Sequence, residues 1–423
     1  MAPSLWAERA APAWLNAPAD ADAPTQASRP RRSGFSKGAP ASDRSQLLVE
    51  AFGFEAAAEL SDDWSDLVSR CLEPNVFMEP GFALAAAQHL ARTDRPTFVG
   101  VWESDSAGQR GRLVGLWGLS LPRTGRRRDA VTLWCHKHAA LGLPLLDAER
   151  AETVIPAMFA WLRGAFPQLR IVVLPKLIRD GPTFARILGY ALESGLQWRI
   201  LDQHERAVLT EGGAGLTLSK QRREGLGRRR RQLEARGPVG ISSAHDPLEI
   251  RNATEAFLAL EESGWKGRRR TALLSDGSRA AFARTMTRRL ACQGKCRIDA
   301  LTLNGRPIAM GIVLRSLDRA FFWKIAYDEA FASQSPGVQL ALEVTRNQQA
   351  DATCSMTDSC AIADNPMIDR LWHDQLPIAD IALPLYPAAN EALAGFAWRD
   401  TLLRRLRAWA GNIVRAARGE TRS

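Results

Sequence analysis

Hydrophobic and polar positions in the second half of the chain follow the pattern of consecutive strands. Residues 298–303 and 307–314 are apolar-rich runs separated by Asn304-Gly305, the strongest short signal for a β-hairpin. Residues 320–327 form a third run, which is rich in aromatic and β-branched side chains. The pattern predicts an antiparallel meander of three strands.

A turn and a helix are predicted after the third strand. Ser335 suits a helix N-cap, Pro336 suits the first helical position, and residues 338–346 have helical spacing of apolar side chains. A further strand is expected around residues 352–358. Free N–H groups and the positive end of the helix dipole would meet at Ser335-Pro336-Gly337, which predicts an anion site suited to a pyrophosphate. Capping without any ligand is the plainer interpretation and stays open.

The first half of the chain repeats this order of elements about two hundred positions earlier. Strand patterns lie at residues 96–103, 113–121, 130–134 and 171–174, and a helix pattern lies at residues 149–163. Between the third strand and the helix, residues 141–147 lack the Ser-Pro-Gly cap. The sequence therefore predicts a duplicated α/β fold in which only the second half keeps the anion site.

Composition indicates a multidomain protein without a membrane span. The chain has 423 residues, of which 46% are hydrophobic, enough for two or three domains. No run of about eighteen apolar residues and no signal-peptide core is present, so we expect a cytoplasmic protein. Six cysteines form no C-x-x-C pair, and residues 135–138, Cys-His-Lys-His, are not expected to hold a metal.

The net charge of +10 is concentrated in two segments. Residues 220–236 carry eight basic and two acidic side chains, including four consecutive arginines at 228–231. This predicted helix either binds an anion, such as a CoA phosphate, a nucleotide-sugar or RNA, or is simply a solvated helix face.

The second basic segment, residues 396–423, has an amphipathic helical pattern. Leu402, Leu406, Trp409 and Ile413 recur at spacings of four, three and four, with arginines largely outside that stripe. Contact with an anionic membrane surface is one interpretation. Packing of the stripe on the body of the protein is the favoured one.

Five strings resemble the CelD/BcsL-type acetyltransferases of the GNAT superfamily, bacterial proteins linked to cellulose and exopolysaccharide biosynthesis. They are SGWKG at 263–267, LNGRPIA at 303–309, WKIAYDE at 323–329, SPGVQL at 335–340 and NPMIDRLW at 365–372. Such proteins are similar to the Fem peptidyltransferases in having two GNAT-like halves. The resemblance implies an α/β (α+β) fold of two tandem GNAT-like domains, each a mixed, mostly antiparallel sheet flanked by helices.

The expected organisation has four parts. A disordered tail occupies residues 1–45, an N-terminal GNAT-like domain with a degenerate donor site residues 46–205, a C-terminal GNAT domain with the acyl-CoA site residues 206–395, and a basic amphipathic helix residues 396–423.

The resemblance implies acetyl-CoA or another acyl-CoA as co-substrate, with no metal, and places the donor along the aromatic strand and over the Ser-Pro-Gly turn. Cofactor-binding candidates are therefore Ser335, Gly337, Val338 and Gln339. Candidates for the base or for acceptor positioning are Asp328 and Asp358, and Tyr327 is a candidate to protonate the leaving thiolate. Trp265, Lys266 and Lys324 are substrate-binding candidates. Structural roles, as strand end, core residue or turn cap, stay open for each catalytic candidate.

The sequence leaves three possible functions to be tested. The first is N- or O-acyl transfer from acyl-CoA to a polysaccharide precursor or related small metabolite. The second is Fem-like transfer from aminoacyl-tRNA, with residues 220–236 gripping the RNA. The third is a non-catalytic GNAT scaffold of an exopolysaccharide complex, recruited through the C-terminal helix.

Overall fold

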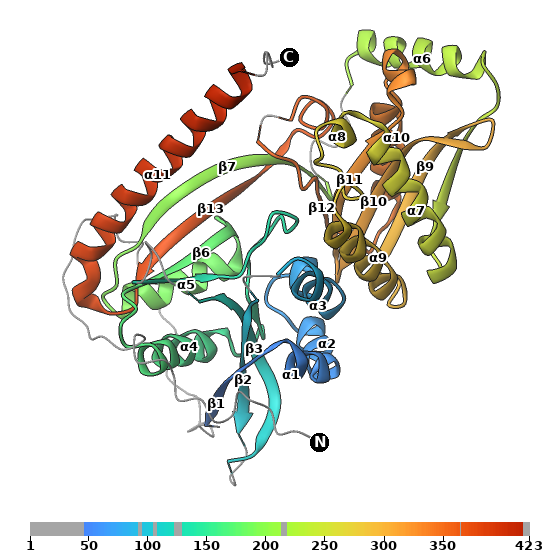
Figure 1. Cartoon of the computed structure of the whole chain (residues 1–423). Helices are drawn as coiled ribbons and strands as arrows, with labels where there is room; N and C mark the ends of the chain where they lie inside the picture. Colours follow the sequence, from blue (N-terminus) through green and yellow to red (C-terminus); the bar gives the residue numbers. More distant parts are fainter. Residues whose placement is uncertain are drawn as a thin grey trace.

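The computed structural model describes residues 46–91, 95–104, 108–121, 129–212, 218–363 and 365–417 (Figure 1). The predicted disordered tail, residues 1–45, and the last residues, 418–423, lie outside this part of the chain.

The elements of the first half are β1 (Leu47–Phe52), α1 (Phe54–Glu59), α2 (Ser61–Ser69), η1 (Val76–Met78), α3 (Pro80–His89), β2 (Thr97–Ser104), β3 (Arg110–Ser120), β4 (Ala130–Leu133), β5 (Leu145–Leu146), α4 (Ala151–Ala165), β6 (Ile171–Ile178), α5 (Pro182–Glu193) and β7 (Arg199–Thr210). Those of the second half are α6 (Lys220–Glu234), β8 (Val239–Ala244), α7 (Pro247–Ser263), α8 (Trp265–Arg268), α9 (Gly277–Ala291), β9 (Cys296–Leu303), β10 (Arg306–Ser316), β11 (Arg319–Tyr327), η2 (Glu329–Gln334), α10 (Pro336–Ala350), β12 (Met356–Asp358), β13 (Asp374–Pro384), η3 (Pro387–Ala389) and α11 (Asn390–Ala417).

The predicted meander is confirmed as β9, β10 and β11, paired antiparallel. Its first turn has positive φ at both Asn304 (52°) and Gly305 (75°), the backbone conformation of a type I′ hairpin turn. The predicted helix and following strand are α10 and β12, with η2 inserted between β11 and α10.

One continuous sheet runs through both halves in the order β1-β2-β3-β4-β6-β13-β7-β12-β11-β10-β9-β8. From β1 to β6 the pairings are antiparallel three times and then parallel. From β8 to β12 they follow the same sequence. The predicted duplicated α/β fold is therefore confirmed by strand pairing.

The two central strands are exchanged between the halves. β7 ends the first half in sequence but pairs with β12 of the second, whereas β13 from the second half pairs with β6 of the first. β7 and β13 also pair with each other along most of their length, and Figure 1 shows both strands crossing between the halves. Residue 205, the expected domain boundary, lies inside β7.

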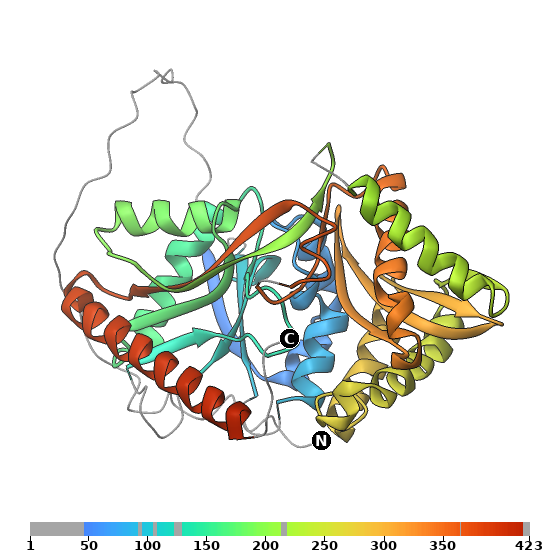
Figure 2. The ribbon, with the colours of Figure 1, turned by 90° about the horizontal axis from the view of Figure 1, so that it is seen from above.

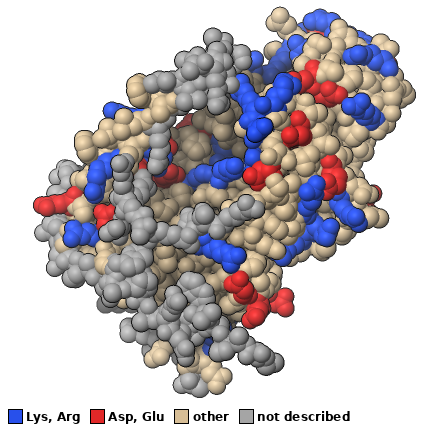
Figure 3. All heavy atoms as spheres, in the orientation of Figure 1, with Lys and Arg blue, Asp and Glu red and all other residues tan. Residues whose placement is uncertain are grey.

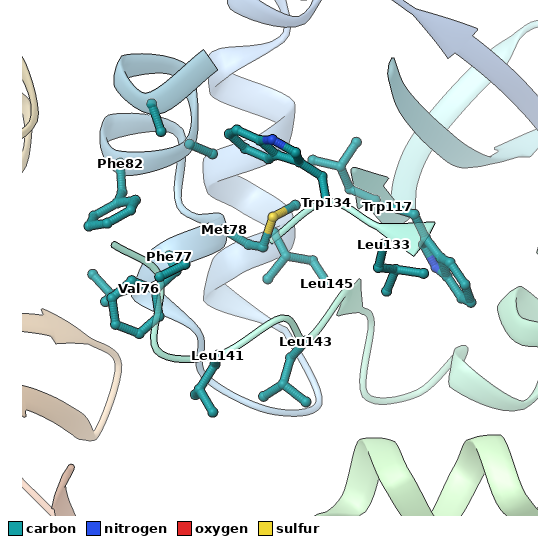
Figure 4. Packing of buried hydrophobic residues seen from close by; sticks show 14 of the residues in the cluster. Val76, Phe77, Met78, Phe82, Trp117, Leu133, Trp134, Leu141, Leu143 and Leu145 are labelled. Carbon is teal, nitrogen blue, oxygen red and sulfur yellow. The ribbon is translucent and has the colours of Figure 1, made fainter. Parts of the chain in front are cut away.

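Apolar packing joins the halves beside the exchanged strands. Phe82 of α3 contacts Phe282 of α9 and Trp323 of β11, with ring centroids 5.3 and 6.0 Å apart. Figure 4 shows Phe82 in the same buried cluster as Leu141 and Leu143, which come from the segment between β4 and α4. One cluster of buried apolar residues thus contains side chains from both halves.

Helix α11 begins at Asn390 and packs on β7 and β13 through its first turns, where Leu393 and Phe396 are buried. Figure 2 shows the helix lying along the side of the first half. Leu402, Leu406 and Trp409 are 42%, 51% and 63% exposed. The expectation that this stripe packs on the body is wrong for these three residues, although Arg404 on the same helix still pairs with Asp202 of β7 and Asp380 of β13. No helix among the described residues is long and apolar enough to cross a membrane.

Candidate active site

Strand β11 has an open edge beyond its first three residues. It pairs with β12 only at Arg319, Ala320 and Phe321, so residues 322–327 have no strand partner on that side within the described chain. The pairing with β10 shifts register at Trp323, which forms a β-bulge. Splayed strands leave backbone N–H and C=O groups free to pair with a ligand, and bulges re-aim side chains beside such sites.

The N-terminus of α10 lies against the far end of β11. A Cβ on Gly337 would come 3.4 Å from Tyr327 Cδ1 and 3.7 Å from Ile325 Cδ1. Val338 is half-buried, and Gln339 is buried with its side-chain amide donating to the Gln334 carbonyl at 2.9 Å. The first amides of α10 therefore sit where the free edge of β11 ends.

The prediction that the Ser335 side chain caps α10 is wrong. It takes a left-handed conformation (φ 52°, ψ 54°), and its side chain makes no capping hydrogen bond. Instead its hydroxyl accepts a hydrogen bond at 2.8 Å from Arg229 Nη1 of the basic helix α6. Because η2 reaches α10 through a tight left-handed turn, the hydroxyl is directed to α6 instead of to the amides.

Helix α6 thus brings a cation to the predicted anion site. Arg229 bonds Ser335, whereas Arg230 pairs with Glu234 on its own helix at 2.9 Å. Arg236, just beyond the helix, lies over the Phe331 ring of η2 at 4.9 Å. The consecutive arginines therefore point to different partners, and one of them serves the turn.

A pocket of about 250 Å³, called here the tyrosine pocket, adjoins this turn. It is lined by Leu260, Glu261, Gly264, Trp265, Lys266, Ile325, Ala326, Tyr327, Asn365 and Met367. Trp265 is 43% exposed and lies under the Arg269 guanidinium, 5.4 Å from its ring centroid. Lys266 Nζ donates to the Ile325 carbonyl of β11 at 3.1 Å.

A larger pocket of about 430 Å³, called here the lysine pocket, lies where the halves meet. It is lined by Lys137, His138, Ala139, Ala140, Lys176, Asp202, His204, Arg206, Trp323, Lys324, Cys360, Ala361, Ile362 and Ala363. Figure 3 shows a hollow between the halves with basic side chains gathered at it. Trp323 Nε1 donates to the His138 carbonyl at 2.8 Å, which fixes the bulge of β11 to the first half.

Glu261 connects the two pockets and was not among the predicted site residues. Its Oε1 lies 2.8 Å from Lys266 Nζ and 3.9 Å from Lys324 Nζ, and its Oε2 accepts from the Leu273 amide at 2.7 Å. Burial would raise the pKa of Glu261, but the two ammonium groups outweigh it and hold the pKa below the usual value. The only sequence signal was its position just before the SGWKG string.

Burial lowers the pKa of Lys324 from 10.5 to about 8, with Glu261 opposing the shift. Burial also lowers the pKa of His138 to about 2, so that imidazole is neutral in the physiological range. The lysine pocket therefore carries its positive charge on ammonium groups.

The predicted catalytic residues do not converge on one point. Tyr327 lines the tyrosine pocket. Asp328 caps η2, accepting from the Ala330 amide at 3.0 Å, and lies 3.7 Å from Arg306. Asp358 is fully buried, and its two oxygens accept bidentate bonds of 2.7 and 2.6 Å from Arg206. Only Tyr327 of the three faces either pocket.

The first half differs at the corresponding place. Residues 141–147, between β4 and α4, are buried, and Leu143 and Leu145 are completely inaccessible. Ahead of α4, the buried Asp147 accepts from the Glu149 amide at 2.9 Å and pairs with Arg70. The Asp147 carboxylate thus lies just before α4, at the place in the first half that corresponds to the turn before α10 in the second.

Residues 220–364, which contain the unpaired edge of β11, its bulge and the N-terminus of α10, match the family described as "Acetyltransferase (GNAT) domain". The chain therefore contains a GNAT acetyltransferase domain, and the predicted enzyme class is confirmed. Among the described residues, no group of three or more His, Cys, Asp or Glu side chains is arranged to hold a metal.

The solved structures that this chain matches have low sequence identity and TM-scores below 0.5. FemX is 9% identical with a TM-score of 0.49, covering 79% of this chain and 98% of its own. The C-terminal domain of a protein described as a lysylphosphatidylglycerol synthetase from Agrobacterium fabrum is 12% identical with a TM-score of 0.48, covering 80% and 94%. A tandem GNAT protein from the clavulanic acid biosynthesis pathway is 12% identical with a TM-score of 0.38, covering 81% and 99%. No curated protein sequence matches this chain.

Proposed function

We propose that the protein transfers an acyl group from acyl-CoA to an amine or hydroxyl of an acceptor. The observation that carries the proposal is the N-terminus of α10, supplied with Arg229, at the end of the unpaired edge of β11. Free helix amides and a guanidinium suit phosphate groups, and the open strand edge suits the amide groups of pantetheine. Residues 220–364, which match the acetyltransferase family, contain all three features.

The residues present fit an acyl-CoA donor. We assign the phosphate groups to the backbone of Gly337 and Val338 and to the Ser335–Arg229 pair. Gln339 Oε1 is buried without a hydrogen-bond partner among the described residues, so it is available to a donor amide. Acyl-CoA supplies the activated thioester, and this chain's contribution is to hold and orient it.

The reacting groups would meet where the tyrosine and lysine pockets approach each other. β11 lines the first through Tyr327 and the second through Lys324, and Glu261 touches lysines from both. We propose that Tyr327 donates a proton to the leaving thiolate, and that Glu261 positions Lys266 and Lys324. Because Asp358 is committed to Arg206, we assign it a structural role.

We further propose that the acceptor is a polysaccharide precursor and that the enzyme acts in the cytoplasm, where acyl-CoA is available. The support is the resemblance of the five strings, including SGWKG at 263–267 and SPGVQL at 335–340, to CelD/BcsL-type acetyltransferases. Trp265, half-exposed beside the tyrosine pocket, offers a ring face on which a sugar can stack.

The proposal predicts that acetyl-CoA or a longer acyl-CoA raises the thermal unfolding temperature of the full chain. Binding to the folded state alone stabilises it by about 2.7 kcal/mol at a ligand concentration 100 times Kd. Differential scanning fluorimetry with acetyl-, succinyl- and palmitoyl-CoA measures the shift. No shift with any acyl-CoA contradicts the proposal.

Arg229→Gln is expected to weaken acyl-CoA binding by about five- to tenfold at low salt, because a cation beside the phosphates is lost. Arg223→Gln, an exposed change on the same helix, is the matched control and is expected to change binding less than twofold. Titration at low and high ionic strength separates the two variants. Equal losses would show that α6 acts only through its overall charge.

A further inference from the structure

Lysine is scarce in this protein and concentrated at one place. The chain has seven lysines against 49 arginines, yet three of the seven, Lys137, Lys176 and Lys324, line the lysine pocket. A fourth, Lys266, shares the Glu261 carboxylate with Lys324. A chain that uses arginine almost everywhere for positive charge therefore places compact ammonium groups around this cavity.

The other charges in the lysine pocket are already neutralised. Arg206 is in its bidentate pair with Asp358, and Asp202, the acidic residue of the lining, pairs with Arg404 of α11 at 2.7 Å. Burial and the neighbouring Arg206 lower the pKa of His204, and His138 is neutral. The three lysines are thus left as the net charge of the pocket.

Two of these lysines have no acidic partner among the described residues, and the third shares one. Lys176 Nζ donates to the neutral Ala139 carbonyl at 2.6 Å, and neither it nor the exposed Lys137 forms an ion pair with a described residue. Lys324 has one acid nearby, Glu261 at 3.9 Å, which lies closer to Lys266.

The backbone also holds Lys176 in an unusual conformation. Its φ of 49° is left-handed, rare for a lysine within a strand. The Asp380 carboxylate of β13 accepts from its amide at 2.9 Å, and the Gly142 amide donates to its carbonyl at 3.2 Å. Strained positions of this kind persist where the surroundings hold them, and they cluster at binding sites.

We propose that the lysine pocket receives the acceptor and that this acceptor carries a phosphate or carboxylate group, held by Lys137, Lys176 and Lys324. This inference rests on the proposed function and names its substrate class. Glu261 lines the tyrosine pocket and Lys324 lines the lysine pocket, so their contact connects the two. In this arrangement the lysine pocket holds the anionic group, and the nucleophile of the acceptor is directed to the donor at β11.

The test measures the reaction of individual lysines with acetic anhydride, followed by mass spectrometry of the full-length protein. Desulfo-coenzyme A, which has no thiol to react with the anhydride, is kept saturating so that the donor phosphate site is filled. Inorganic phosphate, glucose 1-phosphate, glucuronate and glucose are the probes. Phosphate-bearing and carboxylate-bearing probes distinguish the two anionic groups, and glucose is the neutral control.

We expect at least one anionic probe to slow acetylation of Lys137, Lys176 and Lys324 by threefold or more, while Lys220 on α6 is unchanged. Glucose should leave all four rates unchanged. Lys176→Met should weaken the protecting anion by fivefold or more, Lys176→Arg should retain it, and Lys220→Met should have no effect.

Protection by no anion, or equal protection by glucose, overturns this inference. Protection that survives Lys176→Met overturns it as well, since the anion would then bind elsewhere. Thermal stabilisation by acyl-CoA is measured separately, so a protein that binds acyl-CoA but shows no lysine protection keeps the proposed function and loses only the anionic acceptor.

Discussion

Gly337→Glu is expected to abolish the stabilisation of the protein by acyl-CoA. The new carboxylate would lie at the first turn of α10, against Tyr327 and Ile325, where the donor phosphates are assigned. Two like charges about 4 Å apart repel by roughly 4 kcal/mol near a protein surface, which corresponds to a loss of affinity of at least about 100-fold. Differential scanning fluorimetry and calorimetric titration with acetyl-CoA measure this loss.

Gly337→Ala is the matched control. Its Cβ would lie 3.4 Å from Tyr327 Cδ1, at the lower limit of ordinary van der Waals contact, and alanine favours a helix. Binding should stay within about threefold of the parent protein, because no charge is added. If Gly337→Glu still binds acetyl-CoA with parental affinity, the donor phosphates do not lie at the start of α10.

Asp358→Asn is expected to destabilise the protein by about 3–5 kcal/mol, because it leaves the Arg206 guanidinium buried without a counter-charge. The new amide group would also face a donor, since the two Asp358 oxygens accept from Arg206 Nε and Nη2 and one also accepts from the Cys360 amide. Urea unfolding followed by tryptophan fluorescence measures the change.

Two further variants show whether the loss comes from the buried charge. Asp328→Asn keeps an acceptor for the Ala330 amide on a partly exposed side chain and should cost less than about 1 kcal/mol. Arg206→Met combined with Asp358→Leu removes both charges and should recover most of the stability. An Asp358→Asn protein that is as stable as the parent but inactive in acyl transfer would instead make Asp358 a proton acceptor.

Local patterns in the sequence were sufficient to predict the meander and the position of the turn before α10. The strands β9, β10 and β11 pair with their neighbours along the chain. Alternating apolar side chains and the Asn304-Gly305 turn were therefore enough to predict this pairing. The position of Ser335 was predicted, but its left-handed conformation was not, because η2 fixes the approach of the chain to α10.

Contacts between distant segments could not be predicted from such patterns. Asp358 pairs with Arg206, which lies 152 positions earlier, and no local spacing indicates this partner. In the sequence, Glu261 is one of several acids in a predicted helix. Its contact with Lys324 arises only in the fold, where α7 packs beside β11 and Lys266 also reaches it. Amphipathic spacing likewise predicted a buried stripe in α11, whereas Leu402, Leu406 and Trp409 are exposed and Arg404 pairs with the sheet.

Because β7 and β13 are exchanged between the halves, each half needs a strand from the other to complete its part of the sheet. The acetyltransferase match ends at residue 364, before β13 begins at Asp374, and begins after β7 ends at Thr210. A chain divided between the halves would split the sheet, leave β6 without β13 and β12 without β7, and expose unpaired strand edges, which promote aggregation. We therefore expect recombination to transfer the two halves together, although the acetyltransferase match covers only the second.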